Sequence, residues 1–261
     1  MREQSPPRAN YIKAVSRFFP IMVGTYVLEI EKVIDETPEV KTYRLRIPEG
    51  SGLAYTTGQF FMLKVFGPDG AIIEETRAYS ISSSPADEGF IEFTIQLVGS
   101  FTHKIWERKA GDKVELKGPF GHFTFTDEMK EPVVMVGAGS GVTPLRAILT
   151  YVAKKNLTNR VDLLYSCRKP DLIIFEKEFH KIMEKHPNIK VHFTITRLAE
   201  GEKWDGETGR WDKERIQKKV GDCIKDARCY LCGPVAFVQS MKKDLLELGA
   251  KQELIKQEQW G

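Results

Sequence analysis

The stretch VVMVGAGSGVTPLRAIL, residues 133–149, decides the fold of the second half of this chain. An apolar run, a glycine-rich turn and a helical pattern follow one another, an order that offers backbone amides and a helix N-terminus to a phosphate. Three glycines let the backbone approach a ligand closely: Gly137, Gly139 and Gly141. We expect Thr143 to cap the helix and Pro144 to stand in its first turn. Val142 replaces a glycine of the standard dinucleotide fingerprint, so a tight connection without a ligand is the alternative.

Downstream of this stretch, apolar strand patterns alternate with helical ones. Strands are expected at residues 133–136, 161–166, 191–196 and 228–233, with helices at 144–155, 172–185 and 236–249. Continuous apolar strands between helices predict a parallel sheet covered on both faces.

Upstream, short apolar runs are separated by glycine, proline and aspartate. They lie at residues 23–34, 40–47, 58–66, 77–82, 89–98 and 112–118, with one helix expected at 100–109. Regular short strands of this kind predict an antiparallel barrel or sandwich. The pattern changes near residues 126–132. We therefore expect an extension over residues 1–22, a β-barrel domain over 23–128 and an α/β domain over 129–261.

The composition describes a globular protein, 41% hydrophobic and 29% charged over 261 residues. A net charge of +3 is too small to argue for nucleic acid or a membrane surface. Residues 18–34, the most apolar early run, include a proline and two glutamates, so no membrane insertion is expected. Four cysteines are too few for a secreted disulfide scaffold, which favours reduced thiols and a cytoplasmic location. Cys229 and Cys232 would face opposite sides of one strand, so no metal site is expected.

A second stretch, RAYSISS at residues 77–83, places an unusual set of side chains on a strand. Alternation puts one group of side chains on one face: Arg77, Tyr79, Ile81 and Ser83. Ala78, Ser80 and Ser82 point the other way. A cation, an aromatic plane and a hydroxyl thus share a face and have no obvious partner nearby in the sequence. Taken alone, this set also fits an ordinary barrel edge.

Three motifs in this order, RAYSISS, GAGSGVTP and CGP, resemble those of the ferredoxin–NADP reductase superfamily. The resemblance covers about residues 23–258. It implies a β-barrel whose R-x-Y-S-x-x-S strand holds a flavin, followed by an α/β domain that holds a nicotinamide nucleotide. Relatives with their own iron–sulfur module carry C-x4-C-x2-C and a distant fourth cysteine. Here the spacing of Cys223, Cys229 and Cys232 is C-x5-C-x2-C, so no such module is expected.

The resemblance assigns roles to the RAYSISS strand. Arg77 would pair with the flavin's phosphate, a task suited to a permanently charged planar fork. Tyr79 would stack on the isoalloxazine ring, and Ser80 would lie near flavin N5. Ser83 would help to hold the phosphates.

A pyrophosphate site is implied at the start of the expected helix 100–109. Residues 99–102 match the family's G-x-x-S or G-x-x-T pattern, and the free amides and hydroxyls of Gly99, Ser100 and Thr102 suit a pyrophosphate. A pyrophosphate site favours FAD over FMN. The loop at residues 117–123, KGPFGHF, resembles the family's G-P-F/Y-G loop and is otherwise a plain turn.

The motif CGP and the C-terminal residues would complete the site. Cys232, Gly233 and Pro234 match the segment near the nicotinamide, although Cys232 also fits a small buried hydrophobe. It would not act as a nucleophile, because hydride transfer needs positioning rather than covalent attack. Trp260 would shield the open face of the flavin, and Glu258 would serve in proton handling. Simple packing is the alternative for Trp260.

Basic residues follow two of the expected strands of the α/β domain. Arg168, Lys169 and Arg197 could pair with a 2′-phosphate, whereas no carboxylate suited to a free 2′-hydroxyl is obvious there. Asp171 follows a proline and is expected to begin the next helix. This pattern favours NADP(H) over NAD(H), and a solvated strand end is the alternative.

The resemblance implies a reductase that passes hydride between NAD(P)H and FAD, and single electrons between the flavin and a separate carrier. That carrier would be ferredoxin, flavodoxin or a partner oxidoreductase subunit. Two alternatives remain open: an electron-transfer subunit active only within a larger complex, and a non-catalytic flavin or nucleotide sensor. In the extension, one helical face is expected to pack on the chain's own barrel or on a partner, and it carries Tyr11, Ile12, Val15, Phe18 and Phe19.

Overall fold

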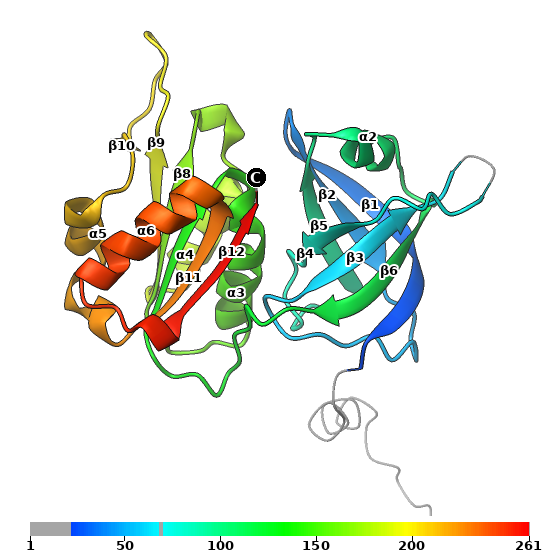
Figure 1. The fold of residues 1–261 in the computed structure, drawn as a ribbon, viewed down its shortest axis with the longest axis horizontal. Coiled ribbons are helices and arrows are strands. Elements are labelled where there is room, and N and C mark those ends of the chain that lie inside the picture. Colours follow the sequence, from blue (N-terminus) through cyan, green and yellow to red (C-terminus); the bar gives the residue numbers. More distant parts are fainter. Residues whose placement is uncertain (1–21, 68–69, 261) are drawn as a thin grey trace, which may run out of the picture.

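The computed structural model describes residues 22–67 and 70–260 of the chain. The helical face expected on Tyr11, Ile12, Val15, Phe18 and Phe19 lies outside the described residues. Two six-stranded sheets form two domains that stand side by side (Figure 1).

The N-terminal sheet is antiparallel throughout, with the strand order β4-β3-β6-β1-β2-β5. Its strands are β1 (Gly24–Thr37), β2 (Val40–Arg46), β3 (Phe60–Val65), β4 (Arg77–Ser80), β5 (Phe90–Gln96) and β6 (Lys113–Phe120). An antiparallel bridge from Ile81 to Phe93 links the two edges of this sheet, so the sheet curls into a barrel. The predicted antiparallel barrel is confirmed.

Alternating side chains of the barrel strands fill its core, as in Leu28 and Ile30 of β1, which are 3% and 0% exposed. Helix α2 (Ser100–Trp106) closes one end and buries Phe101 and Ile105 against this core. The helix ends at Trp106, three residues before the expected end at residue 109.

The C-terminal sheet is parallel, with the strand order β10-β9-β8-β7-β11-β12. Its strands are β7 (Val133–Ala138), β8 (Val161–Cys167), β9 (Ile189–Ile195), β10 (Glu207–Thr208), β11 (Arg228–Pro234) and β12 (Ile255–Trp260). Its helices are α3 (Val142–Lys154), α4 (Glu176–Lys185), α5 (Lys213–Val220) and α6 (Val235–Glu247). The predicted parallel α/β sheet is confirmed. Strand β10 and helix α5 were not predicted, although Asp212 caps α5 by accepting from the Arg215 amide.

Helix α4 begins at Glu176 rather than at residue 172, because Phe175 is left-handed with φ 63°. Helices α3 and α4 pack on the face of the sheet turned toward the barrel, and α5 and α6 pack on the other face (Figure 1). Cys232 belongs to the first of these two cores and Cys229 to the second. The two thiols therefore face opposite sides of β11, as their spacing predicts.

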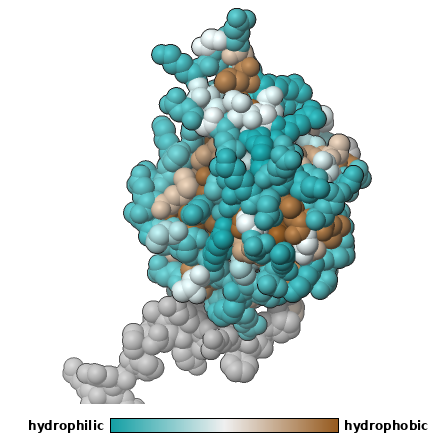
Figure 2. Space-filling view, turned by 90° about the vertical axis from the view of Figure 1, so that its left-hand side faces the viewer, coloured by the Kyte–Doolittle hydropathy of each residue, from teal (hydrophilic) through white to brown (hydrophobic). Residues whose placement is uncertain are grey.

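The face of the α/β domain turned away from the barrel is largely hydrophilic, with small scattered apolar patches (Figure 2). In the barrel domain, three large apolar side chains just before β1 and near its start are exposed: Met22 (73%), Val23 (53%) and Val27 (50%). Among the described residues, no helix has the length and apolar character needed to cross a membrane.

Candidate functional site

The barrel and the α/β domain meet through a hydrogen bond between β4 and β12. The Ser80 hydroxyl donates to Glu258 Oε2 over 3.1 Å. Glu258 pairs in register with Cys232 of the neighbouring β11. Burial raises the pKa of the Glu258 carboxyl, and the hydrogen bond from Ser80 opposes this rise. Ser80, Cys232 and Glu258, all predicted as site residues, are thus brought to one place.

Cys232 is 1% exposed, and burial raises the pKa of its thiol well above the ordinary value, with a further contribution from the charge of Glu258. The thiol is therefore protonated at neutral pH. This state excludes a thiolate nucleophile and leaves a small, neutral group beside the carboxyl.

Trp260 lies over the glycine turn at the carboxyl end of β7. A Cβ atom on Gly141 would lie 2.7 Å from Trp260 Cη2 and 2.2 Å from the Cys232 carbonyl oxygen. Only glycine fits there. Trp260 pairs in register with Pro234, and its side chain is 41% exposed. The structure thus places the indole against the glycine turn and beside Cys232.

Of the three glycines predicted to let a ligand approach, Gly139 is the one that is open. Gly139 has φ +53°, a conformation that favours glycine, and no atom would obstruct a Cβ there within 4 Å. The Tyr165 hydroxyl of the neighbouring strand β8 donates to the Gly139 carbonyl over 3.1 Å and fixes the turn. Gly137 and Gly233 are closely packed, because a Cβ would lie 2.7 Å from Leu145 and 2.9 Å from Phe237 respectively.

Helix α3 begins directly after this turn. Pro144 stands in its first turn, as predicted. The capping role expected for Thr143 is wrong, because the N-cap is Gly141 and no side chain caps it. The Thr143 hydroxyl donates instead to the Ser140 carbonyl over 2.6 Å and tightens the turn itself.

A second group of polar side chains lies at the rim of the barrel. The Glu75 carboxylate accepts from Arg77 Nη2 at 2.8 Å, Ser100 Oγ at 3.1 Å and Lys104 Nζ at 2.6 Å. Arg77 and Ser100 are thus brought together as predicted, with Lys104 as an additional cation. Sequence reasoning missed Lys104, although it stands four residues after Ser100 on the same helix face.

Tyr79 lies next to this group. Its ring stacks on Phe101 of α2, with centroids 5.8 Å apart and planes at 28°. Burial raises the pKa of Tyr79 to about 12, so its hydroxyl is neutral. Arg77 and Lys104 already hold one oxyanion, the Glu75 carboxylate, and the half-buried ring of Tyr79 lies beside them. These cations and this ring suit the phosphate and the ring system of a flavin nucleotide.

Two predicted phosphate ligands lie elsewhere. Ser83 is 1% exposed; its hydroxyl accepts from the Glu92 amide and shares a hydrogen bond with the Tyr55 hydroxyl. The Thr102 hydroxyl accepts from the Val98 and Gly99 amides and donates to the Gly99 carbonyl. Both hydroxyls are thus bonded within the barrel, and these contacts do not support a role for either toward a phosphate.

Arg168 and Arg197 lie at the carboxyl ends of the neighbouring strands β8 and β9. The Arg197 amide donates to the Arg168 carbonyl over 2.9 Å, which brings these two residues together. Both residues are exposed. Lys169 Nζ forms a long, exposed ion pair with Glu202 Oε1 at 3.9 Å.

A buried ion-pair network joins the two domains behind the RAYSISS strand. Arg146 of α3 donates to the Ser82 carbonyl at 3.0 Å and to Glu92 at 2.7 Å. It also forms a two-point contact with Glu178 at 2.7 and 3.1 Å. Arg44 donates to Glu92 from the other side at 2.9 Å. Sequence reasoning missed this network, because its members come from four separate elements.

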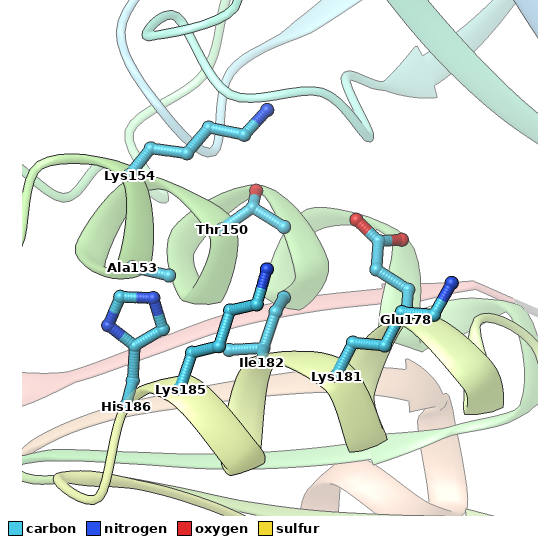
Figure 3. A pocket seen from close by; sticks show the side chains of 8 residues that line it. All are labelled: Thr150, Ala153, Lys154, Glu178, Lys181, Ile182, Lys185 and His186. Carbon is cyan, nitrogen blue, oxygen red and sulfur yellow. The ribbon is translucent and has the colours of Figure 1, made fainter.

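A hollow of about 200 Å³ lies between α3 and α4 (Figure 3). Its floor includes Ala153 and Ile182, and Lys181, Lys185 and His186 stand around it. None of the predicted cofactor residues lines this hollow. It therefore lies apart from the site formed by β4, β12 and the glycine turn.

Two family models match the chain. The oxidoreductase FAD-binding domain matches residues 27–125, and the oxidoreductase NAD-binding domain matches residues 135–243. The first covers the barrel with β4 and α2, and the second covers the glycine turn and β11.

Curated relatives are similar over most of this chain. A component of the Na(+)-translocating NADH-quinone reductase of Klebsiella pneumoniae is 25% identical over 85% of this chain and 64% of its own length. A flavohemoprotein of Bordetella pertussis is 26% identical over 97% of this chain and 65% of its own length. The chain therefore spans less than two thirds of the length of these two relatives.

Solved structures share the fold. The flavohem-like FAD/NAD binding domain of nitric oxide dioxygenase from Vibrio cholerae is 27% identical, with a TM-score of 0.77, over 90% of this chain and 98% of that chain. A ferredoxin NADP+ reductase from Neisseria gonorrhoeae with bound FAD and NADP has a TM-score of 0.73 at 22% identity, over 90% of this chain and 98% of that chain.

Proposed function

Because the chain belongs to the ferredoxin reductase-like family of flavoproteins, we propose that it passes hydride between NAD(P)H and FAD, and single electrons between the flavin and a separate protein. The observation that carries the proposal is the 3.1 Å hydrogen bond from Ser80 to Glu258, with Cys232 beside it. This bond joins β4, the predicted flavin strand, to β12, which pairs with the predicted nicotinamide segment at Cys232. A bound flavin would supply the step between two-electron and one-electron chemistry.

The chain's own residues would bind and orient both nucleotides. Arg77, Ser100 and Lys104 would hold the phosphates of the flavin nucleotide, and Tyr79 would support its ring. Gly139 would let a second nucleotide approach the backbone at the start of α3. Ser80 would turn its hydroxyl from Glu258 to a ring nitrogen at the reacting edge, and Glu258 would hold a proton nearby.

We propose FAD rather than FMN, because Ser100 and Lys104 extend the anion site beyond Arg77. We propose NADP(H) rather than NAD(H), because the exposed Arg168 and Arg197 meet at the carboxyl edge of β8 and β9. Guanidinium groups at this edge suit a 2′-phosphate.

The electron acceptor would be a separate protein: ferredoxin, flavodoxin or a partner oxidoreductase subunit. A second candidate function is that of an electron-transfer subunit, active only with its partner. The exposed apolar side chains of Met22, Val23 and Val27 favour this candidate, since a partner could cover them.

The cysteines are free, which supports a cytoplasmic location.

Anaerobic stopped-flow spectroscopy tests the proposal. The purified protein, loaded with FAD, is mixed with NADPH or NADH while the flavin absorbance is followed. Rapid bleaching by NADPH alone supports the reductase and the preference, and rapid bleaching by NADH alone overturns only the preference. A flavin that neither nucleotide bleaches excludes the reductase. Rapid bleaching with only weak turnover of artificial acceptors by the protein alone favours the second candidate.

A further inference from the structure

The Glu75 carboxylate lies at the barrel rim and binds three donors from β4 and α2. It lies in the connection between β3 and β4, two residues before Arg77. Its carboxylate accepts from Arg77, Ser100 and Lys104 at 2.6–3.1 Å and is 19% exposed. The neighbouring Glu74 has a different environment: it pairs with Lys64 at 3.0 Å and is 85% exposed.

The donors held by Glu75 are suited to a phosphate as well. A carboxylate and a phosphate are both oxyanions, and both are bound by arginine, lysine and hydroxyl donors. The hydrogen bond from Lys104 is the main cause that lowers the pKa of Glu75, with Ser100 and Arg77 adding to it. The carboxylate is therefore ionised at neutral pH, and it would repel a phosphate placed at the same donors.

We propose that Glu75 is a built-in competitor for the phosphates of the flavin nucleotide. Its carboxylate satisfies Arg77, Lys104 and Ser100, and a phosphate must displace it to bind the same donors. Glu75 thereby weakens flavin binding and keeps the basic rim neutralised when no nucleotide is present. This inference rests on the proposed function, because it takes the donors of this rim as the flavin phosphate site.

The competing explanation is that Glu75 positions Arg77 and Lys104 for the phosphate. The two explanations predict opposite effects of Glu75→Gln on affinity. The glutamine keeps the shape of the side chain but removes the charge. Under competition, the variant binds FAD more tightly; under positioning, it binds FAD more weakly.

The test titrates apoprotein with FAD and with riboflavin, following flavin fluorescence. We expect Glu75→Gln to lower the Kd for FAD by on the order of tenfold. The Kd for riboflavin should stay unchanged, because riboflavin carries no phosphate. Glu74→Gln is the matched control, since it removes one charge from the adjacent residue and should leave both constants unchanged. An unchanged or weaker FAD affinity in Glu75→Gln overturns the inference.

A second measurement separates this inference from the proposed function. If the wild-type protein binds neither FAD nor riboflavin, the flavoprotein assignment of this chain fails. Inorganic pyrophosphate then probes the rim alone through the rise in thermal unfolding temperature. A larger rise in Glu75→Gln than in the wild type and Glu74→Gln supports competition at the anion site. Equal rises in all three proteins overturn it.

Discussion

Ser80 and Glu258 stand 178 residues apart in the chain, yet a 3.1 Å hydrogen bond joins them across the two domains. Ser80 ends β4 of the barrel, and Glu258 belongs to the edge strand β12 of the parallel sheet. The pair is therefore part of both the proposed chemistry and the contact between the domains.

Ser80→Ala tests the chemistry. Removing a preorganised donor from a reacting edge typically costs about 100-fold or more in rate. We expect the rate of flavin bleaching by the preferred nicotinamide nucleotide to fall by about 100-fold, with little change in the Kd for FAD. Rapid mixing measures the first quantity and fluorescence titration the second.

Ser83→Ala is the matched control for this prediction, because Ser83 lies three residues further along and its hydroxyl is used within the barrel. We expect normal bleaching by this variant and a small loss of stability. Equal losses of rate in Ser80→Ala and Ser83→Ala would show that the strand, rather than the Ser80 hydroxyl, is responsible.

Glu258→Gln tests the effect of burial on this carboxyl. Burial raises the pKa of Glu258 above its ordinary value of 4.5, so the folded state holds the proton more tightly than the unfolded state. That stabilisation is complete below the ordinary value and is lost as the pH rises through the raised pKa. The glutamine variant has no such loss. The free energy of unfolding of the variant minus that of the wild type should therefore increase as the pH rises from about 4 to 8.

Urea unfolding at several pH values measures this difference. Other titrating groups, such as Glu36 with its pKa also raised mainly by burial, are present in both proteins and cancel in the comparison. A constant difference between the two proteins over the whole range would contradict the raised pKa of Glu258.

Arg146→Met tests the network that joins the domains. The variant would leave Glu92, whose side chain is 2% exposed, without its main cation. Burial alone would raise the pKa of Glu92, but Arg146 and Arg44 outweigh it and lower the pKa. Breaking a buried pair costs about 3–5 kcal/mol, and we expect a loss of this size in the free energy of unfolding.

Two further variants serve as controls in the same urea experiment. The double variant Arg146→Met/Glu92→Gln removes the buried charge as well and should recover part of the loss. Lys213→Ala breaks an exposed pair with Glu247, whose side chains are 49% and 42% exposed, and should cost far less stability than Arg146→Met. Similar losses in Arg146→Met and Lys213→Ala would show that the buried network adds no special stability.

The two-domain fold could be predicted from sequence because its signals are local. The alternation in β1, the apolar runs of β7, β8 and β11, and the glycine turn each lie within one short segment. The positive φ of Gly139 and the close approach of Gly141 to Cys232 agree with the glycines read from the motif. Helix α5 was missed because only Ile216 and Val220 are buried on it.

Much of the site depends on contacts between distant residues, which a single sequence does not reveal. Glu75 meets Lys104 across 29 residues, and Arg146 meets Glu92 across 54. Strict alternation also fails after β4. Ile81, Ser82 and Ser83 are all buried, because the Ser82 hydroxyl accepts from Thr94 and the Ser83 hydroxyl accepts from the Glu92 amide, both within the barrel.

The preference for NADP(H) is tested by Arg197→Ala. A hydrogen bond to a charged group contributes about 1.5–3 kcal/mol, or roughly 10- to 100-fold in affinity. If Arg197 binds the 2′-phosphate, the KM for NADPH should rise by about tenfold or more, while the KM for NADH stays unchanged. Lys169→Ala is the control, because this cation lies in a long, exposed ion pair with Glu202 and a smaller effect is expected. Equal rises for NADPH and NADH in Arg197→Ala would mean that Arg197 supports the edge of β9 in general, and the preference would then need another source.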